Sequence, residues 1–211
     1  MEPKDAFERL VDVVDAHGKL SPAALMRIYD RNAKFYDQDI DLMRWKGPEL
    51  VAEAVSRHLT DKCSSILDIC SGTGAVGEQL HRLGLFNVDY LDGSMEMTAI
   101  AMKKRVYRAY FCQIISEHNG ILLRSASYDA TVVSGGKLLW EEMLRITKPG
   151  GVCVAALLDF PRGLFVKSLN HLQQLEGSGI SAVIENAQVE SIECDLQGNP
   201  LPGRVLVVRK F

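Results

Sequence analysis

The spacing of apolar side chains predicts three helices in the N-terminal part of the chain. Over 5–16 the apolar residues recur at helical intervals, which predicts an amphipathic helix. Ser21 and Pro22 are a favoured N-cap and first helical residue, so a second helix is predicted from there toward Tyr36. A third helix is predicted over 49–59, because its apolar residues again fall on one face.

Further along the chain, short apolar runs alternate with amphipathic stretches. The runs predict strands at 65–69, 88–91, 107–115, 128–134, 152–158, 188–194 and 204–208. Helices are predicted at 75–83, 95–105, 138–147 and 163–176, and a loop at 116–127. This alternation is typical of an α/β fold. We therefore expect an N-terminal helical lid, 1–62, followed by a core domain, 63–211.

The stretch from Ser65 to Gly77 contains the most informative pattern. It has a short apolar strand with Asp68 near its end, a glycine-rich turn and then a helix start. Gly72 and Gly74 let the backbone turn tightly and approach a ligand, since neither has a Cβ. The helix start presents unpaired N–H groups. The sequence therefore predicts a nucleotide pocket at the carboxyl ends of the strands.

Two cofactors compete for that pocket. The spacing Gly72-x-Gly74-x-x-Gly77, with Asp92 twenty residues after Gly72, matches a dinucleotide fingerprint. Asp68 argues against a dinucleotide, because a carboxylate beside the turn would repel a pyrophosphate. The same carboxylate attracts the sulfonium and ammonium groups of S-adenosylmethionine (SAM). A strand–turn–helix without any ligand, and Asp92 as a plain turn residue, remain the alternatives.

Several segments resemble signatures of the class I SAM-dependent methyltransferases. Asp68-x-Cys70-x-Gly72-x-Gly74 resembles their motif I, with Cys70 where the first glycine often stands. The segment 92–95, Asp-Gly-Ser-Met, resembles the second signature, whose acid accepts the two ribose hydroxyls in that family. The segments 128–134 and 144–151 resemble the fourth strand and the turn before the fifth.

The resemblance implies an α/β, Rossmann-like, seven-stranded sheet. Such a sheet is mostly parallel with an antiparallel C-terminal strand, has helices on both faces and here carries an N-terminal helical extension. The terminal hairpin is a feature that the dinucleotide fold lacks, so it favours SAM a second time. Within the class, the chain is most similar to small-molecule methyltransferases, in particular the methyltransferase-like proteins named for the Williams–Beuren syndrome region.

The segment Tyr29-Asp30-x-x-Ala33-x-x-Tyr36-Asp37 resembles the N-terminal segment of many small-molecule methyltransferases. In those enzymes the tyrosines close over the cofactor, where a ring face attracts the sulfonium. Tyr29 and Tyr36 are also seven residues apart, which is the spacing of a helix stripe packed on a core. Both interpretations stay open.

The resemblance assigns cofactor binding to a set of residues and leaves the catalytic residue unspecified. The implied SAM-binding residues are Tyr29, Tyr36, Asp68, Cys70, Ser71, Gly72, Thr73, Gly74, Asp92, Gly93, Ser94, Met95, Gln113 and Ser134. Gln113 stands near the place of the acid that bonds the adenine amino group, and Ser134 ends the strand that faces the methyl. Methyl transfer from a sulfonium needs positioning more than a strong base, and Lys137, His118 and the tyrosines are the candidates for a base.

Composition limits the partners. The net charge is −3 and no dense basic block appears, so we expect no nucleic acid partner. No apolar run approaches ~18 residues, so no membrane span is expected. The polar N-terminus is unlike a signal peptide, and the five cysteines lack C-x-x-C spacing, so no metal site is expected. Four of the cysteines lie in or beside apolar runs, which predicts reduced, buried thiols in a cytoplasmic or nuclear protein.

The Asn/Asp-Pro-Pro-Tyr run of base and amide methyltransferases is absent after the fourth strand, which favours a small-molecule or protein acceptor. A non-catalytic SAM-binding or interaction protein is the alternative.

Overall fold

The computed structural model describes residues 8–9, 19–116, 119–135, 139–159, 164–195 and 197–211. Seven strands in that part of the chain form one sheet in the order β3-β2-β1-β4-β5-β7-β6. The strands are β1 (Ile66–Ile69), β2 (Val88–Asp92), β3 (Tyr110–Cys112), β4 (Tyr128–Ser134), β5 (Thr147–Leu158), β6 (Ser181–Cys194) and β7 (Pro200–Lys210).

Strand direction matches the predicted class of sheet. The pairs β1–β2, β2–β3, β1–β4 and β4–β5 are parallel, and β7 runs antiparallel to both β5 and β6. The predicted mostly parallel, seven-stranded sheet with an antiparallel C-terminal strand is therefore confirmed. The order reverses between β1 and β4, and such a switch point opens a crevice at the carboxyl ends of the strands.

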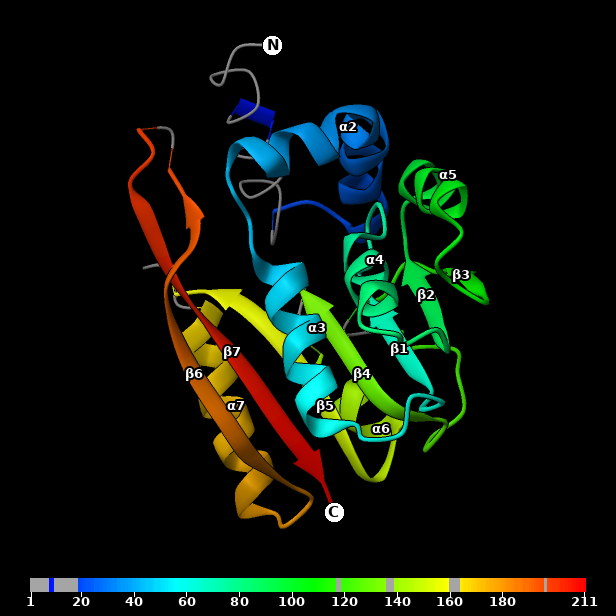
Figure 1. The fold of residues 1–211 in the computed structure, drawn as a ribbon, viewed down its shortest axis with the longest axis vertical. Helices are drawn as coiled ribbons and strands as arrows, with labels where there is room; N and C mark the ends of the chain where they lie inside the picture. The colour runs from blue at the N-terminus through cyan, green and yellow to red at the C-terminus, as the bar shows by residue number, and fades with distance from the viewer. Residues whose placement is uncertain (1–7, 10–18, 117–118, 136–138, 160–163, 196) are drawn as a thin grey trace.

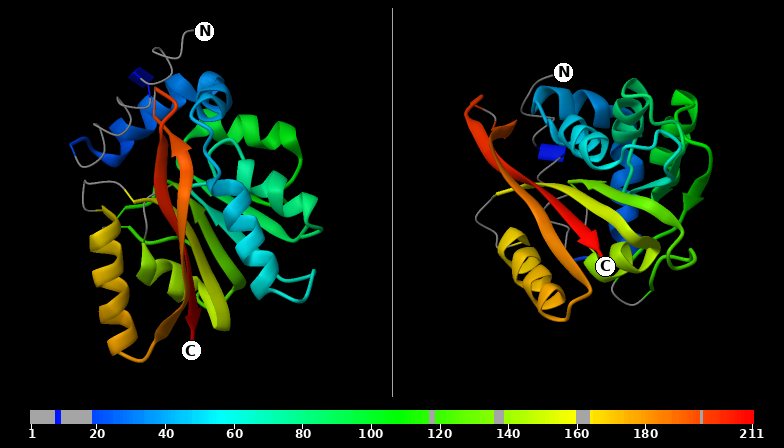
Figure 2. Two further views of the ribbon diagram at one scale, coloured as in Figure 1. Left: turned by 60° about the vertical axis from the view of Figure 1, so that its left-hand side comes forward. Right: turned by 60° about the horizontal axis from the view of Figure 1, so that its bottom comes forward.

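Helices cover both faces of the sheet (Figures 1 and 2). The helices named here are α2 (Pro22–Leu42), α3 (Gly47–His58), α4 (Ala75–Arg82), α5 (Met95–Lys104), α6 (Trp140–Ile146) and α7 (Leu164–Gly177). On one face, Val55 of α3 and Leu80 of α4 pack in the same buried cluster. On the other face, Trp140 of α6 and Leu172 of α7 belong to a second buried cluster.

Helix α2 lies beyond the carboxyl ends of β1 and β4, next to α4 and α5 (Figure 1). The Ser21 hydroxyl accepts a hydrogen bond from Ala24 N at 3.3 Å, so it is the predicted N-cap. The helix continues past Tyr36 to Leu42. Of the helix predicted over 5–16, all but two residues lie outside the described part of the chain. The division into lid and core at residue 62 stays a prediction.

Four strands differ clearly in length from the sequence prediction. β5 begins at Thr147, five residues before the predicted start. β3 has only three residues, because the chain after Cys112 turns into a loop. β6 and β7 are longer than predicted, and β6 carries irregular register between Val183 and Glu185 and between Val189 and Glu193. Polar residues on an edge strand with bulges break the alternation that sequence patterns rely on.

The predicted burial of the cysteines holds in part. Cys153 and Cys194 are buried, whereas Cys63 and Cys112 are exposed. Cys112 lies on the short edge strand β3, which explains why an apolar neighbourhood in sequence did not bury it. None of these thiols forms a disulfide within the described residues. The helices in that part of the chain are too short or too polar to cross a membrane.

Candidate functional site

The turn between β1 and α4 forms the floor of the candidate site. Cys70, Gly72 and Gly74 all have positive φ, at 55°, 54° and 92°, and Gly74 is the N-cap of α4. These left-handed residues reverse the chain at the end of β1. A Cβ on Gly72 would meet only the Tyr36 ring, at 3.8 Å. The backbone at Gly72 is therefore approachable from the side of α2.

Two tyrosines support the turn from behind. The Tyr90 hydroxyl donates to Gly72 O at 2.8 Å, and the Tyr107 hydroxyl accepts from Gly77 N at 3.1 Å. Their rings meet edge to face with centroids 5.2 Å apart. A Cβ on Gly77 would lie 2.4 Å from the Tyr107 ring. Packing against Tyr107 therefore explains why residue 77, the third position of the dinucleotide fingerprint, is a glycine. The match to that fingerprint is then no evidence for a dinucleotide ligand.

Asp68 is fully buried at the centre of this arrangement. Its Oδ2 accepts from the Tyr107 hydroxyl at 2.6 Å, while Oδ1 has no hydrogen-bond partner among the described residues. Burial raises the pKa of Asp68 to about 7, although the bond from Tyr107 opposes the rise. A buried carboxyl with a free oxygen is an incomplete site, because burial without a partner is costly.

Asp92, at the end of β2, joins the turn to the start of α5. Its Oδ2 accepts from Gly72 N at 2.9 Å and its Oδ1 accepts from Ser94 N at 2.8 Å. Burial raises the pKa of Asp92, and the bonds from Ser94 and Gly72 counteract that rise. The backbone of Gly93 also donates to this carboxylate, and a carboxylate can accept about four bonds. Asp92 therefore keeps acceptor capacity for a ligand.

Tyr29 and Tyr36 of α2 approach the same turn. Burial raises the pKa of both hydroxyls, and for each of them Cys70 and Asp92 are among the neighbours that raise it further. The two rings, the Cys70 thiol and the Asp92 carboxylate therefore form one cluster. The rings are both packed and placed at the turn, so the two interpretations of their spacing do not exclude each other.

The charge of the site favours a cationic ligand. Among the described residues, no Lys, Arg or His pairs with Asp68, Asp92 or Glu193, a β6 residue whose charge acts on Tyr36. A sulfonium with an ammonium group would supply the missing positive charge, whereas a pyrophosphate would add negative charge. The residues present therefore fit SAM. The described His, Cys, Asp and Glu residues form no metal-binding cluster.

Known proteins of similar sequence are methyltransferases by name. No model of a protein family matches the chain. Methyltransferase-like protein 27 of Homo sapiens is 29% identical over 176 residues, which span 78% of this chain and 71% of that protein. The demethylmenaquinone methyltransferase of Renibacterium salmoninarum is 29% identical over 153 residues, which span 66% of this chain and 61% of that protein.

Solved structures share the fold at low sequence identity. A SAM-dependent methyltransferase from Aquifex aeolicus matches with a TM-score of 0.57 and 18% identity, covering 84% of this chain and 97% of that one. The [4+2]-cyclase SpnF matches with a TM-score of 0.59 and 15% identity, covering 77% and 81%. The names of these relatives and the shared fold support the class I SAM-dependent methyltransferase superfamily for this chain. Such homologues and fold neighbours imply SAM as the cofactor.

Three hydroxyls that were predicted to bind the methyltransferase cofactor are already engaged with protein groups. Ser71 Oγ donates to Asp68 O at 2.7 Å. Thr73 Oγ1 donates to Asp37 on α2, and Ser94 Oγ donates to Asp30 on α2 at 2.5 Å while capping α5 through Met97 N. The space beside Gly93 is filled by α2, because a Cβ on Gly93 would lie 2.8 Å from Met26 Sδ. Met95 is 72% exposed and is open to a ligand.

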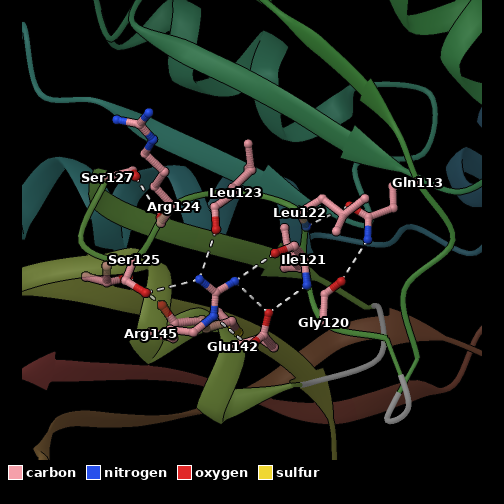
Figure 3. Close-up of polar contacts among 12 residues, drawn as sticks. Gln113, Gly120, Ile121, Leu122, Leu123, Arg124, Ser125, Ser127, Glu142 and Arg145 are labelled. Carbon is pink, nitrogen blue, oxygen red and sulfur yellow. Dashed lines mark hydrogen bonds and ion pairs between the residues drawn. The ribbon is translucent and has the colours of Figure 1, made fainter.

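Gln113 is engaged within its own loop (Figure 3). Its Nε2 donates to Gly120 O at 2.8 Å and its Oε1 accepts from Leu122 N at 3.0 Å. Arg145 of α6 holds the same loop by donating to the carbonyls of Ile121 and Leu123, at 2.8 and 2.9 Å. In this structure the amide shapes the loop after β3, and it is not among the groups that surround the turn.

Ser134, at the end of β4, accepts a hydrogen bond from Trp45 Nε1 at 3.1 Å. A Cβ on Gly135 would lie 3.2 Å from the same indole. Trp45 therefore covers the position that faces the methyl in the resembling family. Lys137 and His118, the candidate bases, lie outside the described residues.

Sequence reasoning missed Tyr107, Trp45 and Glu193 as members of the site. Lys46 N donates to Ile192 O and Cys194 N donates to Met43 O, both at 2.8 Å, so β6 lies along the segment that follows α2. Burial raises the pKa of Glu193, the residue between these two bonds, to about 7. Nothing near Glu193 in the sequence signals this placement, because a hairpin distant in sequence brings it there.

Proposed function

We propose that the chain binds SAM at the glycine turn below α2 and transfers its methyl group to a small-molecule or protein acceptor. The observation that carries the proposal is the pair of carboxylates at the turn, Asp68 and Asp92, which lack a cationic partner among the described residues. Two negative groups at the carboxyl ends of adjacent strands suit a ligand that carries both a sulfonium and an ammonium.

The residues take different roles in this proposal. Asp92 would accept the ribose hydroxyls with the acceptor capacity that its backbone bonds leave open. The Tyr29 and Tyr36 rings would cover the sulfonium side and exclude water. Bound SAM supplies an already activated methyl group, so the protein mainly has to orient the cofactor and the acceptor. The carboxylate of Asp68, buried below the turn, would attract the positively charged groups of the ligand.

Calorimetric titration tests the cofactor. We expect SAM and its demethylated product to bind in the micromolar range, about −8 kcal/mol, and NAD and NADP not to bind. Binding of NAD without binding of SAM would overturn the proposal. A second titration with 5′-methylthioadenosine, which lacks the amino-acid part, should show weaker binding if the carboxylates select the cationic groups.

A non-catalytic SAM-binding protein is the second candidate. Two observations favour it: Trp45 covers Ser134, and a structural neighbour on the same fold is a cyclase by title. The demethylmenaquinone methyltransferases among the relatives favour a small-molecule acceptor instead. Incubation with methyl-labelled SAM and cell extract separates the two, since binding without label transfer supports the non-catalytic protein. A cytoplasmic or nuclear location and the absence of a nucleic acid partner stay predictions.

A further inference from the structure

The repeated Tyr-Asp dipeptide of α2 places two carboxylates above the candidate site. Asp30 and Asp37 each follow one of the two tyrosines and are seven residues apart. Seven residues make about two helical turns, so the two carboxylates share one stripe of α2 and the two rings share the neighbouring stripe. Any contact that fixes the carboxylates therefore also fixes where the rings lie.

Asp30 is bonded to the start of α5. Its Oδ1 accepts from the Ser94 hydroxyl at 2.5 Å and from Glu96 N at 3.2 Å. Ser94 is the N-cap of α5, and Glu96 N is one of the N–H groups that a helix leaves unpaired at its start. A carboxylate is favoured there by the helix dipole as well. Asp30 thus supplies a second cap for α5 from a different helix.

Asp37 is bonded to the glycine turn. It accepts a hydrogen bond from the Thr73 hydroxyl, and its other oxygen lies 3.1 Å from Lys104 Nζ. Lys104 also lies 2.9 Å from Glu78 of α4. The turn before α4, the end of α5 and the middle of α2 are therefore connected through one carboxylate.

These bonds end on the two segments that face the cofactor in the proposed function. Thr73 is next to Gly72. Because Gly72 has no side chain, there is space between its backbone and the Tyr36 ring. Ser94 follows Asp92, the proposed ribose acceptor, by two residues. The helix thus crosses the site and is fastened through Asp30 to the ribose segment and through Asp37 to the glycine turn. A ligand between them is enclosed as long as both fastenings hold.

We propose that Asp30 and Asp37 are positioning residues that hold α2 closed over bound SAM, and that the cofactor leaves only after both contacts break. The proposal rests on the proposed function for the identity of the ligand. Neither carboxylate needs to touch the cofactor. Their effect is on how long the cofactor stays, because an opening step precedes release.

Dissociation of labelled SAM, chased with unlabelled SAM, tests the proposal. Asp30→Asn and Asp37→Asn each weaken charge-assisted bonds, so we expect the dissociation rate to rise about tenfold in each variant. The association rate should change less than about threefold, since mutational effects on affinity are mostly effects on release. Asp41→Asn, an exposed carboxylate of the same helix, is the matched control and should leave the dissociation rate unchanged.

A double-mutant cycle on Asp37 and Thr73 shows whether faster release comes from loss of the bond between them or from a general loss of structure. Thr73→Val removes the hydroxyl, and the combined variant should release SAM less quickly than the two single effects multiplied together predict, because both changes act on the same bond. Thr73→Ser, which keeps the hydroxyl, should release SAM more slowly than Thr73→Val. Additive rates, or a control that speeds release as much as Asp37→Asn does, would overturn the proposal. If the parent protein does not bind SAM, the proposed function fails; if it binds and the variants release at the parental rate, only the fastening fails.

Discussion

The Tyr107 hydroxyl donates a 2.6 Å hydrogen bond to Asp68, and the same oxygen accepts one from Gly77 N. One side chain thereby links the acid of the strand, the helix that follows the glycine turn and the segment before β3. Asp68 and Tyr107 are 39 residues apart in sequence. The other oxygen of this buried carboxyl, Oδ1, has no hydrogen-bond partner among the described residues.

Tyr107→Phe should destabilise the protein without opening a cavity. The variant removes the donor to a buried carboxyl and the acceptor for Gly77 N, and unsatisfied buried groups cost about 1–3 kcal/mol each. The loss should be larger at pH 8 than at pH 5, because the carboxyl of Asp68 needs the donor most when it is charged. Chemical denaturation at the two pH values measures both effects. Tyr110→Phe, whose hydroxyl makes a bond of 3.4 Å, is the control and should lose less. Equal losses in the two variants would contradict the role given to Tyr107.

The pH dependence of stability should contain a contribution from Asp68. Its pKa is about 7 in the folded protein, against 3.8 for the free carboxyl. Between these values the folded state keeps a proton that the unfolded state has released, so the free energy of unfolding falls as pH rises. The slope for one such group is about 1.4 kcal/mol per pH unit. Glu193, with a pKa raised to about 7, acts in the same direction.

Asp68→Asn tests that contribution. Because the variant cannot be charged, its stability relative to the parent should increase from pH 5 to pH 7 and then level off. Asp41→Asn, an exposed carboxylate on α2, provides the comparison. Denaturation curves of the three proteins across this range check the expectation. A constant difference between Asp68→Asn and the parent would show that the folded pKa of Asp68 is not raised.

Gly77→Ala should be destabilising through overpacking. The new Cβ would lie 2.4 Å from the Tyr107 ring, and forcing atoms into a filled core costs about 1–3 kcal/mol. Gly177→Ala at the exposed end of α7 meets nothing within 4 Å and is the matched control. We expect a lower melting temperature for Gly77→Ala and an unchanged or slightly higher one for Gly177→Ala. If the two variants melt together, the packing explanation for the third glycine is wrong.

Asp92→Asn should weaken SAM binding about ten- to hundredfold, since a charge-assisted hydrogen bond is worth roughly 1.5–3 kcal/mol. Unlike a simple ligand group, Asp92 also holds Gly72 N and Ser94 N. Asparagine has one acceptor oxygen, so the apo protein should lose about 1 kcal/mol of stability as well. Titration with the demethylated product and with its 2′-deoxy analogue isolates the ribose contact. A variant that weakens both ligands equally would assign Asp92 to the turn alone.

The sequence by itself determined the features that depend on local chemistry. Gly72 and Gly74 form the tight turn that the glycine pattern predicted, and Ser21 is the predicted N-cap. Each of these needs only the chain within a few residues, so the sequence is sufficient. The class of sheet followed as well, mostly parallel with an antiparallel C-terminal strand, because an α/β alternation with a C-terminal hairpin resembles one known architecture.

Only the tertiary structure decided which partners meet. Asp30 and Ser94 are 64 residues apart, and the bond between them depends on how α2 lies over the sheet. Gly77 matched a ligand motif, yet its small size serves the Tyr107 ring, which enters from the segment before β3. Gln113 stood in the place of an adenine ligand, yet its amide bonds the loop that follows. Sequence patterns report the properties of each residue, whereas the contact that uses those properties is fixed by packing between distant segments.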